Sequence, residues 1–117
     1  MKYFNLSEFD SPDLVGSGEA MDREFLNILD KARGIANTPF KITSGFRTPK
    51  HNTKVGGVDN SSHTIGYAAD IACSNSVQRY KIINALLEAG FNRIGIADTF
   101  IHVDCDPSKS ENVIWTY

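Results

Sequence analysis

Apolar residues recur with a helical period in two segments of the chain, residues 19–35 and 76–87. Spacings of three and four residues place them on one face, which is typical of helices that pack on a core. The apolar stripe predicted for the second helix consists of Val77, Tyr80, Ile83, Leu86 and Leu87. Asn75 or Ser76 is a suitable cap for its start, and Gly90 is a suitable end.

Short apolar runs bounded by turn residues predict strands between and after these helices. They cover residues 40–43, 67–73, 93–97, 100–105 and 113–116, and one or two helical turns are expected from Thr48-Pro49 onwards. Helix, strand, helix and then a group of strands is typical of an α+β domain. We expect a mostly antiparallel central sheet with helices packed on one face, and the pattern leaves the strand order open.

Length and composition fit one soluble domain and exclude several classes of protein. The 117 residues suffice for one core, so we expect a single domain over residues 1–117, and a monomer. A net charge of −2 with scattered Lys and Arg argues against nucleic acid as a partner. The first residues show no apolar run behind a basic end, so we expect neither a signal peptide nor membrane insertion.

The two cysteines, Cys73 and Cys105, are too few for a disulfide framework and lack the Cys-x-x-Cys spacing of a thiolate zinc site. Strand alternation directs both side chains into the core. We therefore expect buried free thiols, and the sequence leaves open whether the two are ever bonded.

Two predicted strands carry polar side chains that a purely apolar core does not explain. Asp70 lies within the run 67–73, although Asp is disfavoured in strands and rarely buried without a partner. In the later run 100–105, alternation places His102 and Asp104 on one face. His63 lies in a glycine-containing loop just before the first of these strands.

Two imidazoles and one carboxylate suit zinc, with a fourth position left for water as in catalytic zinc sites. The spacing alone favours a hydrogen-bonded histidine and a surface aspartate over a metal site, because it lacks the helical regularity of His-Glu-x-x-His. The third histidine, His51, lies in a polar stretch, where we expect a solvated helix surface and no catalytic role.

Three stretches combine these candidates with further polar residues: 44–47 (SGFR), 61–70 (SSHTIGYAAD) and 102–104 (HVD). Together they resemble the pattern of M15-type zinc peptidases, the family of D-Ala-D-Ala carboxypeptidases and peptidoglycan endolysins. The similarity continues through residues 9–13, 47–52 and 56–57, so it covers nearly the full chain.

The resemblance implies zinc held by His63, Asp70 and His102. It also implies that Arg47 reaches the substrate carbonyl or carboxylate, for which a planar guanidinium with two parallel N–H donors is suited. We expect Ser61 to contact substrate as well. The implied reaction is zinc-dependent hydrolysis of a peptide bond in peptidoglycan stem peptides, by a carboxypeptidase or an endopeptidase.

The general base is where the sequence departs from several relatives, which have an acidic residue or a histidine at the positions of Thr99 and Phe100. The nearest carboxylates are Asp98, in the turn before the strand, and Asp104, about 7 Å from His102 along the strand. We favour Asp98 as the base, if its turn folds over the site. Asp104 is the alternative base, or it orients a histidine ligand from behind.

A chain without an export signal resembles phage lytic enzymes, which leave the cytoplasm with the help of a separate pore protein. We therefore expect synthesis in the cytoplasm and action on the cell wall after phage-assisted release. The missing acidic residue at Thr99 also keeps open a non-catalytic module of the same fold that binds the cell wall, with a metal-free structural domain as a third reading.

Overall fold

One five-stranded sheet forms the centre of the protein, and the computed structural model describes residues 1–117. The strands are β1 (Ile42–Ser44), β2 (Ala68–Ala72), β3 (Arg93–Ile96), β4 (Phe100–Asp104) and β5 (Val113–Thr116). Their order across the sheet is β1-β2-β4-β3-β5, and only the β3–β5 pair is parallel. The predicted α+β domain with a mostly antiparallel sheet is confirmed.

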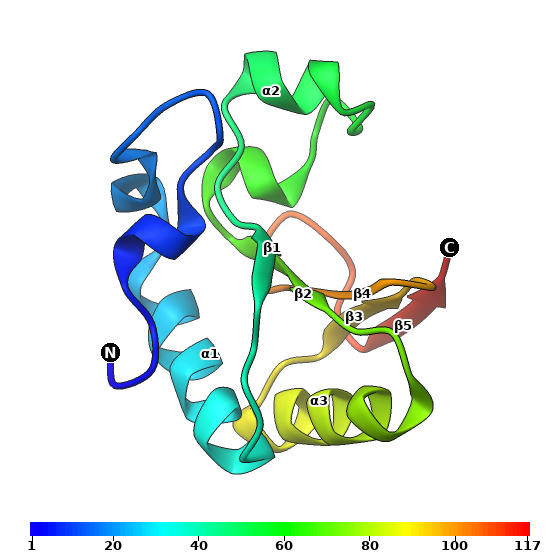
Figure 1. The fold of residues 1–117 in the computed structure, drawn as a ribbon. Coiled ribbons are helices and arrows are strands. Elements are labelled where there is room, and N and C mark those ends of the chain that lie inside the picture. Colours follow the sequence, from blue (N-terminus) through cyan, green and yellow to red (C-terminus); the bar gives the residue numbers. More distant parts are fainter.

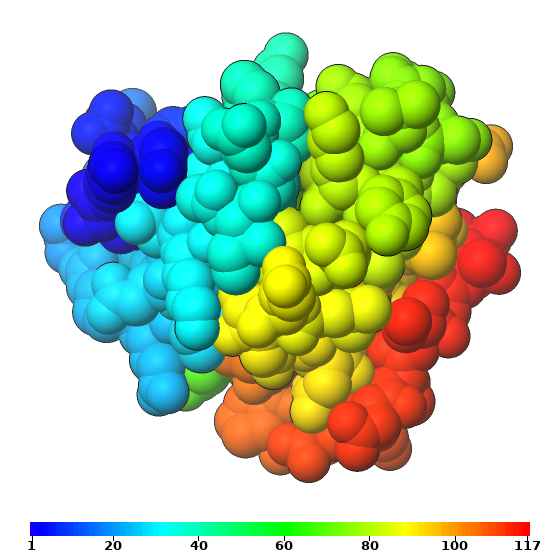
Figure 2. Space-filling view, turned by 90° about the horizontal axis from the view of Figure 1, so that it is seen from below, coloured from blue at the N-terminus to red at the C-terminus, as the bar shows by residue number.

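Two long helices, α1 (Arg23–Ala36) and α3 (Ser76–Ala89), cover one face of this sheet. They contact each other and lie side by side in Figure 2. The short helix α2 (Pro49–Lys54) lies at the top of Figure 1, away from both. Three 3-10 turns complete the elements: η1 (Leu6–Phe9), η2 (Ser17–Ala20) and η3 (Ser62–Ile65).

The core lies between the sheet and the two long helices. Alternate strand residues, among them Ile71, Ile94 and Ile101, point toward the helices and are fully buried. They meet Leu29 of α1 and Leu86 of α3 in one cluster. Because side chains alternate along a strand, the neighbouring residues of β2, β3 and β4 are left on the opposite face, away from the helices.

The limits of α3 agree with the predicted caps. Asn75 accepts a hydrogen bond from the Gln78 N–H, which satisfies one of the free donors of the first turn. Gly90 ends the helix with φ +114°, a left-handed conformation that strains other residues.

The predicted apolar stripe of α3 is wrong in part. Val77, Tyr80 and Leu87 are 68%, 73% and 46% exposed. The residues that face the core are Ile82, Ala85 and Leu86, with Ile83 and Ala89 packed beside them. This second stripe has the same helical spacing, and its small alanines allow close approach to α1 and the sheet.

The start of α1 also differs from the prediction. The segment expected to begin at residue 19 is divided into η2 and a helix that starts at Arg23. Asp22 causes the break. Its carboxylate accepts from the Phe25 N–H, so Asp22 is the N-cap of α1 and not a residue inside the helix.

Both cysteines are free thiols; Cys73 is buried and Cys105 is half-buried. No helix of the structure has the length and apolar character needed to cross a membrane.

Candidate metal centre

His63 enters the site from the η3 turn. The Ser61 hydroxyl caps this turn by accepting from the His63 N–H at 3.3 Å, and Gly66 ends it with φ +79°. The His63 ring is buried, and its Nδ1 lies 2.8 Å from the Gly45 carbonyl oxygen. A carbonyl oxygen only accepts hydrogen bonds, so Nδ1 carries the proton and Nε2 is left with a lone pair.

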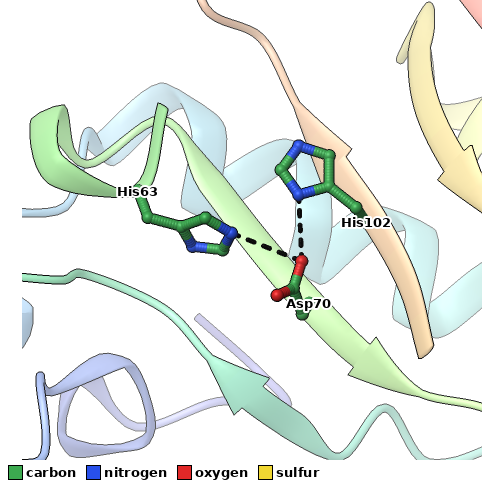
Figure 3. A group of neighbouring side chains, drawn as sticks. All are labelled: His63, Asp70 and His102. Atoms are coloured by element: carbon green, nitrogen blue, oxygen red, sulfur yellow. Dashed lines mark hydrogen bonds and ion pairs between the residues drawn. The ribbon is translucent and has the colours of Figure 1, made fainter. Parts of the chain in front are cut away.

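Asp70 and His102 are brought together by the pairing of β2 with β4. The two residues are direct cross-strand partners on the face opposite the helices. The Asp70 Oδ1 atom lies 2.9 Å from His102 Nδ1 and 3.3 Å from His63 Nε2. Figure 3 shows the two imidazoles approaching this carboxylate from different sides.

A second carboxylate holds the far side of the His102 ring. Asp104 Oδ2 lies 2.7 Å from His102 Nε2, and Asp104 Oδ1 accepts from Arg93 Nε at 2.6 Å. A carboxylate faces each ring nitrogen of His102, so without a metal both favour the doubly protonated ring. A metal ion between His102 and Asp70 would take the Nδ1 lone pair and leave the proton on Nε2, where Asp104 accepts it. The chain Arg93–Asp104–His102 therefore orients one ring of the cluster.

The charges in this cluster depend on one another. Burial alone would raise the pKa of Asp70, but hydrogen bonds and positive charge from His102 and His63 hold that pKa well below its usual range. Burial opposes the cationic form of His102, yet Asp104 and Asp70 outweigh it and raise the pKa of His102. The pKa of Asp104 is lowered despite its burial by hydrogen bonds from His102 and Arg93.

The three side chains fit a zinc ion by their donor chemistry. One ligand atom from each of His63, Asp70 and His102 lies within 4.8 Å of the others. Zinc binds nitrogen and oxygen at about 2.0–2.2 Å in a tetrahedron, so two of its ligand atoms lie roughly 3.3–3.5 Å apart. The 3.3 Å from His63 Nε2 to Asp70 Oδ1 agrees with this spacing. A nitrogen lone pair facing a carboxylate oxygen needs a cation between them, either a metal ion or a proton.

The cluster lies in a cleft of about 400 Å³. Arg47 is part of its wall: Nε donates to Ser44 Oγ at 3.0 Å, and Nη2 lies 3.4 Å from Asp70 Oδ2. Its Nη1 contacts Asn52 Oδ1 at 3.3 Å, so the guanidinium is held on three sides. Loop residues 55–58 form one rim of the cleft, and Trp115 and Tyr117 of the β5 segment belong to its wall.

The structure does not bring Asp98 to this cluster. Asp98 is exposed in the turn between β3 and β4. This turn lies beyond the end of β2, because the Cys73 N–H, just after β2, donates to the carbonyl of Thr99 in the turn. Asp98 lies four positions before His102, about 13 Å along an extended strand. The turn does not fold over the cleft, and Asp98 is not among the cleft residues. The geometry thus gives no support to Asp98 as the base.

The other sequence candidates are placed as follows. Asp104 is 1% exposed and orients His102, which agrees with the second of its two expected roles. Ser61 belongs to the cleft wall, although its hydroxyl is already engaged in capping η3. His51 lies on α2 outside the cleft.

Sequence reasoning missed Arg93 and Lys109. Arg93 donates to the Ser110 carbonyl as well as to Asp104, and its guanidinium lies 5.1 Å from the Trp115 ring. Strand alternation could have placed Arg93 on the cluster side of the sheet, because Ile94 and Ile96 occupy the core side. Lys109 donates to the Asn60 carbonyl and lies in a loop, for which no pattern of this kind exists.

The match to known proteins covers most of the chain. Residues 3–104 match the family model described as Peptidase M15, and the matched segment contains all three residues of the His-Asp-His cluster. No curated protein gives a significant match. Peptidases of this family are metallopeptidases that generally depend on zinc, and the geometry of the cluster is compatible with zinc binding. The chain therefore belongs to the peptidase M15 family.

Proposed function

We propose that the protein hydrolyses a peptide bond in the stem peptides of bacterial peptidoglycan, as a D-Ala-D-Ala carboxypeptidase or as an endopeptidase. The position of Arg47 carries this proposal. Its Nη2 lies 3.4 Å from the metal-side carboxylate of Asp70, so a group bound by the guanidinium lies next to the metal. Stem peptides offer both a carboxylate and a scissile carbonyl for such a contact.

A bound zinc ion would polarise the scissile carbonyl and lower the pKa of water. The protein groups supply orientation. The Gly45 carbonyl accepts from His63 Nδ1, so His63 Nε2 is left for the metal, and Asp104 accepts from His102 Nε2, so Nδ1 is the ligand atom of that ring. Arg47 holds the substrate, and the Trp115 ring, 5.5 Å from the His102 ring, covers one side of the centre.

The resemblance to phage endolysins supports a setting for this activity. In it, the protein is made in the cytoplasm and reaches the cell wall after phage-assisted release. We propose the stem peptide as its partner and a monomer as its working form.

A second candidate function is a non-catalytic module that binds the cell wall through the same cleft. One observation favours it: Thr99 and Phe100 occupy positions where several relatives have a group that takes a proton, and neither side chain is able to do so. Asp98 does not replace that group, since it is not among the cleft residues.

The two candidates differ in whether new peptide termini are formed. Zinc-loaded protein is incubated with purified peptidoglycan, and the released peptides are identified by mass spectrometry. Parallel samples contain a chelator or the His63→Ala variant, and both are expected to stop cleavage. Cleavage that continues unchanged without metal would refute the metallopeptidase mechanism. Retention on the cell wall without new termini would favour the binding module.

A further inference from the structure

The cleft contains few groups that can exchange or share a proton with a substrate. Besides the three ligand candidates, its ionisable residues are Arg47, Arg93, Asp104, Lys109 and Tyr117. Arginine keeps its proton at any relevant pH, and both oxygens of the buried Asp104 are already engaged. The Lys109 ammonium donates to the Asn60 carbonyl at 2.9 Å and to the Ser62 hydroxyl at 3.0 Å. Tyr117 is left as the accessible group, at 71% exposed.

The backbone of β5 directs Tyr117 toward the metal centre. The Tyr117 N–H donates to the Ile96 carbonyl at 3.2 Å, which continues the parallel ladder with β3. The side chain then crosses β3, because its ring lies 5.3 Å from the ring of Phe100 on β4. Phe100 and His102 are alternate residues of one strand, so they share a face.

Trp115 takes the same direction and supports this placement. It is paired with Gly95 of β3, and its ring crosses that glycine to lie 5.5 Å from the His102 ring. A Cβ atom at Gly95 would meet the indole Nε1 at 2.6 Å, so only glycine leaves room for this crossing. Trp115 and Tyr117, the residue after β5, therefore both extend over the sheet toward the His-Asp-His cluster.

The Tyr117 phenol is poised to donate a hydrogen bond. Burial of part of the ring and the charges of Asp70 and Asp104 raise its pKa, and a hydrogen bond with Trp115 and the charge of Arg47 oppose this only in part. The phenol therefore keeps its proton at neutral pH. Tyr117 and Asp70 also line the same cleft.

We propose that the Tyr117 hydroxyl donates a hydrogen bond to the scissile carbonyl oxygen and stabilises the negative charge that develops there. Donors placed where charge develops lower the barrier of acyl-transfer reactions, because they need no reorganisation during the reaction. Phe100 cannot make such a bond, and Tyr117 packs on its ring and brings a hydroxyl to this part of the cleft. The inference rests on the proposed peptidase function.

The first test compares Tyr117→Phe with Tyr80→Phe. Both substitutions remove one hydroxyl from an exposed tyrosine, but Tyr80 lies on α3, which packs on the opposite face of the sheet. For peptidoglycan cleavage by the zinc-loaded protein, we expect Tyr117→Phe to lower kcat about 10–100-fold with little change in KM. The lower end applies if solvent replaces part of the lost bond. Tyr80→Phe is expected to match the wild type.

The second test needs no peptide substrate. Acetohydroxamate is a small probe that binds zinc and presents an oxygen resembling the charged carbonyl, and its affinity for the zinc-loaded protein is measured by calorimetry. We expect Tyr117→Phe to weaken this affinity about 10-fold, close to the value of one hydrogen bond to a charged group. The affinity for zinc itself, measured by chelator competition, is expected to stay unchanged.

The outcomes separate this inference from the proposed function. If the wild type binds acetohydroxamate with the expected dependence on Tyr117 but releases no stem peptides, the proposed substrate fails and the tyrosine contact stands. If Tyr117→Phe binds the probe and turns over substrate like the wild type, the inference is overturned. A matching loss of zinc affinity would also overturn it, since the role would then be structural. A wild type that binds neither zinc nor probe would overturn both.

Discussion

Replacing Arg93 by Met removes a buried cation that supports the His-Asp-His cluster through Asp104. Arg93 Nε donates to Asp104 Oδ1 at 2.6 Å, and Asp104 in turn holds His102 Nε2 at 2.7 Å. Asp104 is 1% exposed, so water cannot take the place of the lost donor without rearrangement of the site. Met keeps most of the volume and the contact with Trp115, so the change tests charge and hydrogen bonding more than packing.

The expected loss of stability follows from the burial of this pair. Removal of one partner from a buried ion pair costs about 3–5 kcal/mol, because the other charge is left uncompensated. Asp104 Oδ1 still accepts from the Asp106 N–H at 3.1 Å, and His102 stays on Oδ2. We therefore expect a loss of about 2–4 kcal/mol in the free energy of unfolding. Zinc affinity should fall about 10–100-fold, because His102 loses its orientation.

Urea unfolding of the zinc-free protein measures the free energy of unfolding, and competition with a chelator measures the zinc affinity. The matched control is Arg23→Met. Arg23 forms a 2.7 Å ion pair with Glu19, but the two side chains are 54% and 71% exposed, so less than about 1 kcal/mol should be lost. If Arg93→Met lowers the free energy of unfolding no more than Arg23→Met does and leaves zinc affinity unchanged, Arg93 does not orient the site through Asp104.

Three further predictions follow from the same geometry. Asp98→Asn should leave zinc affinity and peptide release at wild-type values, because Asp98 is exposed outside the cleft; a loss of turnover with intact zinc binding would restore it as the base. Gly95→Ala should displace the Trp115 ring and destabilise the protein by about 1–3 kcal/mol, since its Cβ would meet the indole at 2.6 Å. Trp115 is the only tryptophan, so a shift in fluorescence emission reports its displacement, and an unchanged spectrum would contradict the crossing over Gly95. Hydrogen bonds from Ser108 and Ser62 outweigh burial and lower the pKa of Asp106 to about 2, so its contribution to stability is present above about pH 4 and is lost as the pH falls through 2. Allowing for solvent near this group, Asp106→Asn should remove about 1–2 kcal/mol at neutral pH and flatten the acid side of the stability curve, as followed by urea unfolding at several pH values.

Local chemistry in the sequence determined much of the fold. Asn75 and Gly90 limit α3 because a side-chain acceptor and a left-handed residue act within one turn of the chain. Alternation along β2 and β4 was enough to separate Asp70 and His102 from the core residues, because the period of a strand is fixed by its backbone. The resemblance to M15-type motifs, which are also short local stretches of sequence, supplied the ligand candidates.

Sequence patterns were insufficient where one helix has two possible apolar faces and where the position of a residue depends on the conformation of a loop. α3 contains two apolar stripes of equal spacing, and only the packing of Ala85 and Leu86 against α1 and the sheet selected one. Asp98 is a base candidate only if its turn folds over the cleft, and the conformation of a turn is not contained in the strand pattern; in the structure Asp98 is exposed and is not among the cleft residues.

The assembly of the His-Asp-His cluster was decided by tertiary structure. The register of β2 against β4 makes Asp70 and His102 direct neighbours, and the η3 turn with the Gly45 carbonyl sets the His63 ring. The partnership of Arg93 with Asp104 depends on the strand order, which no local pattern contains. Sequence patterns act over a few residues and select faces and ends of elements. Which faces meet is settled by the burial of the whole core, a property of all the elements together.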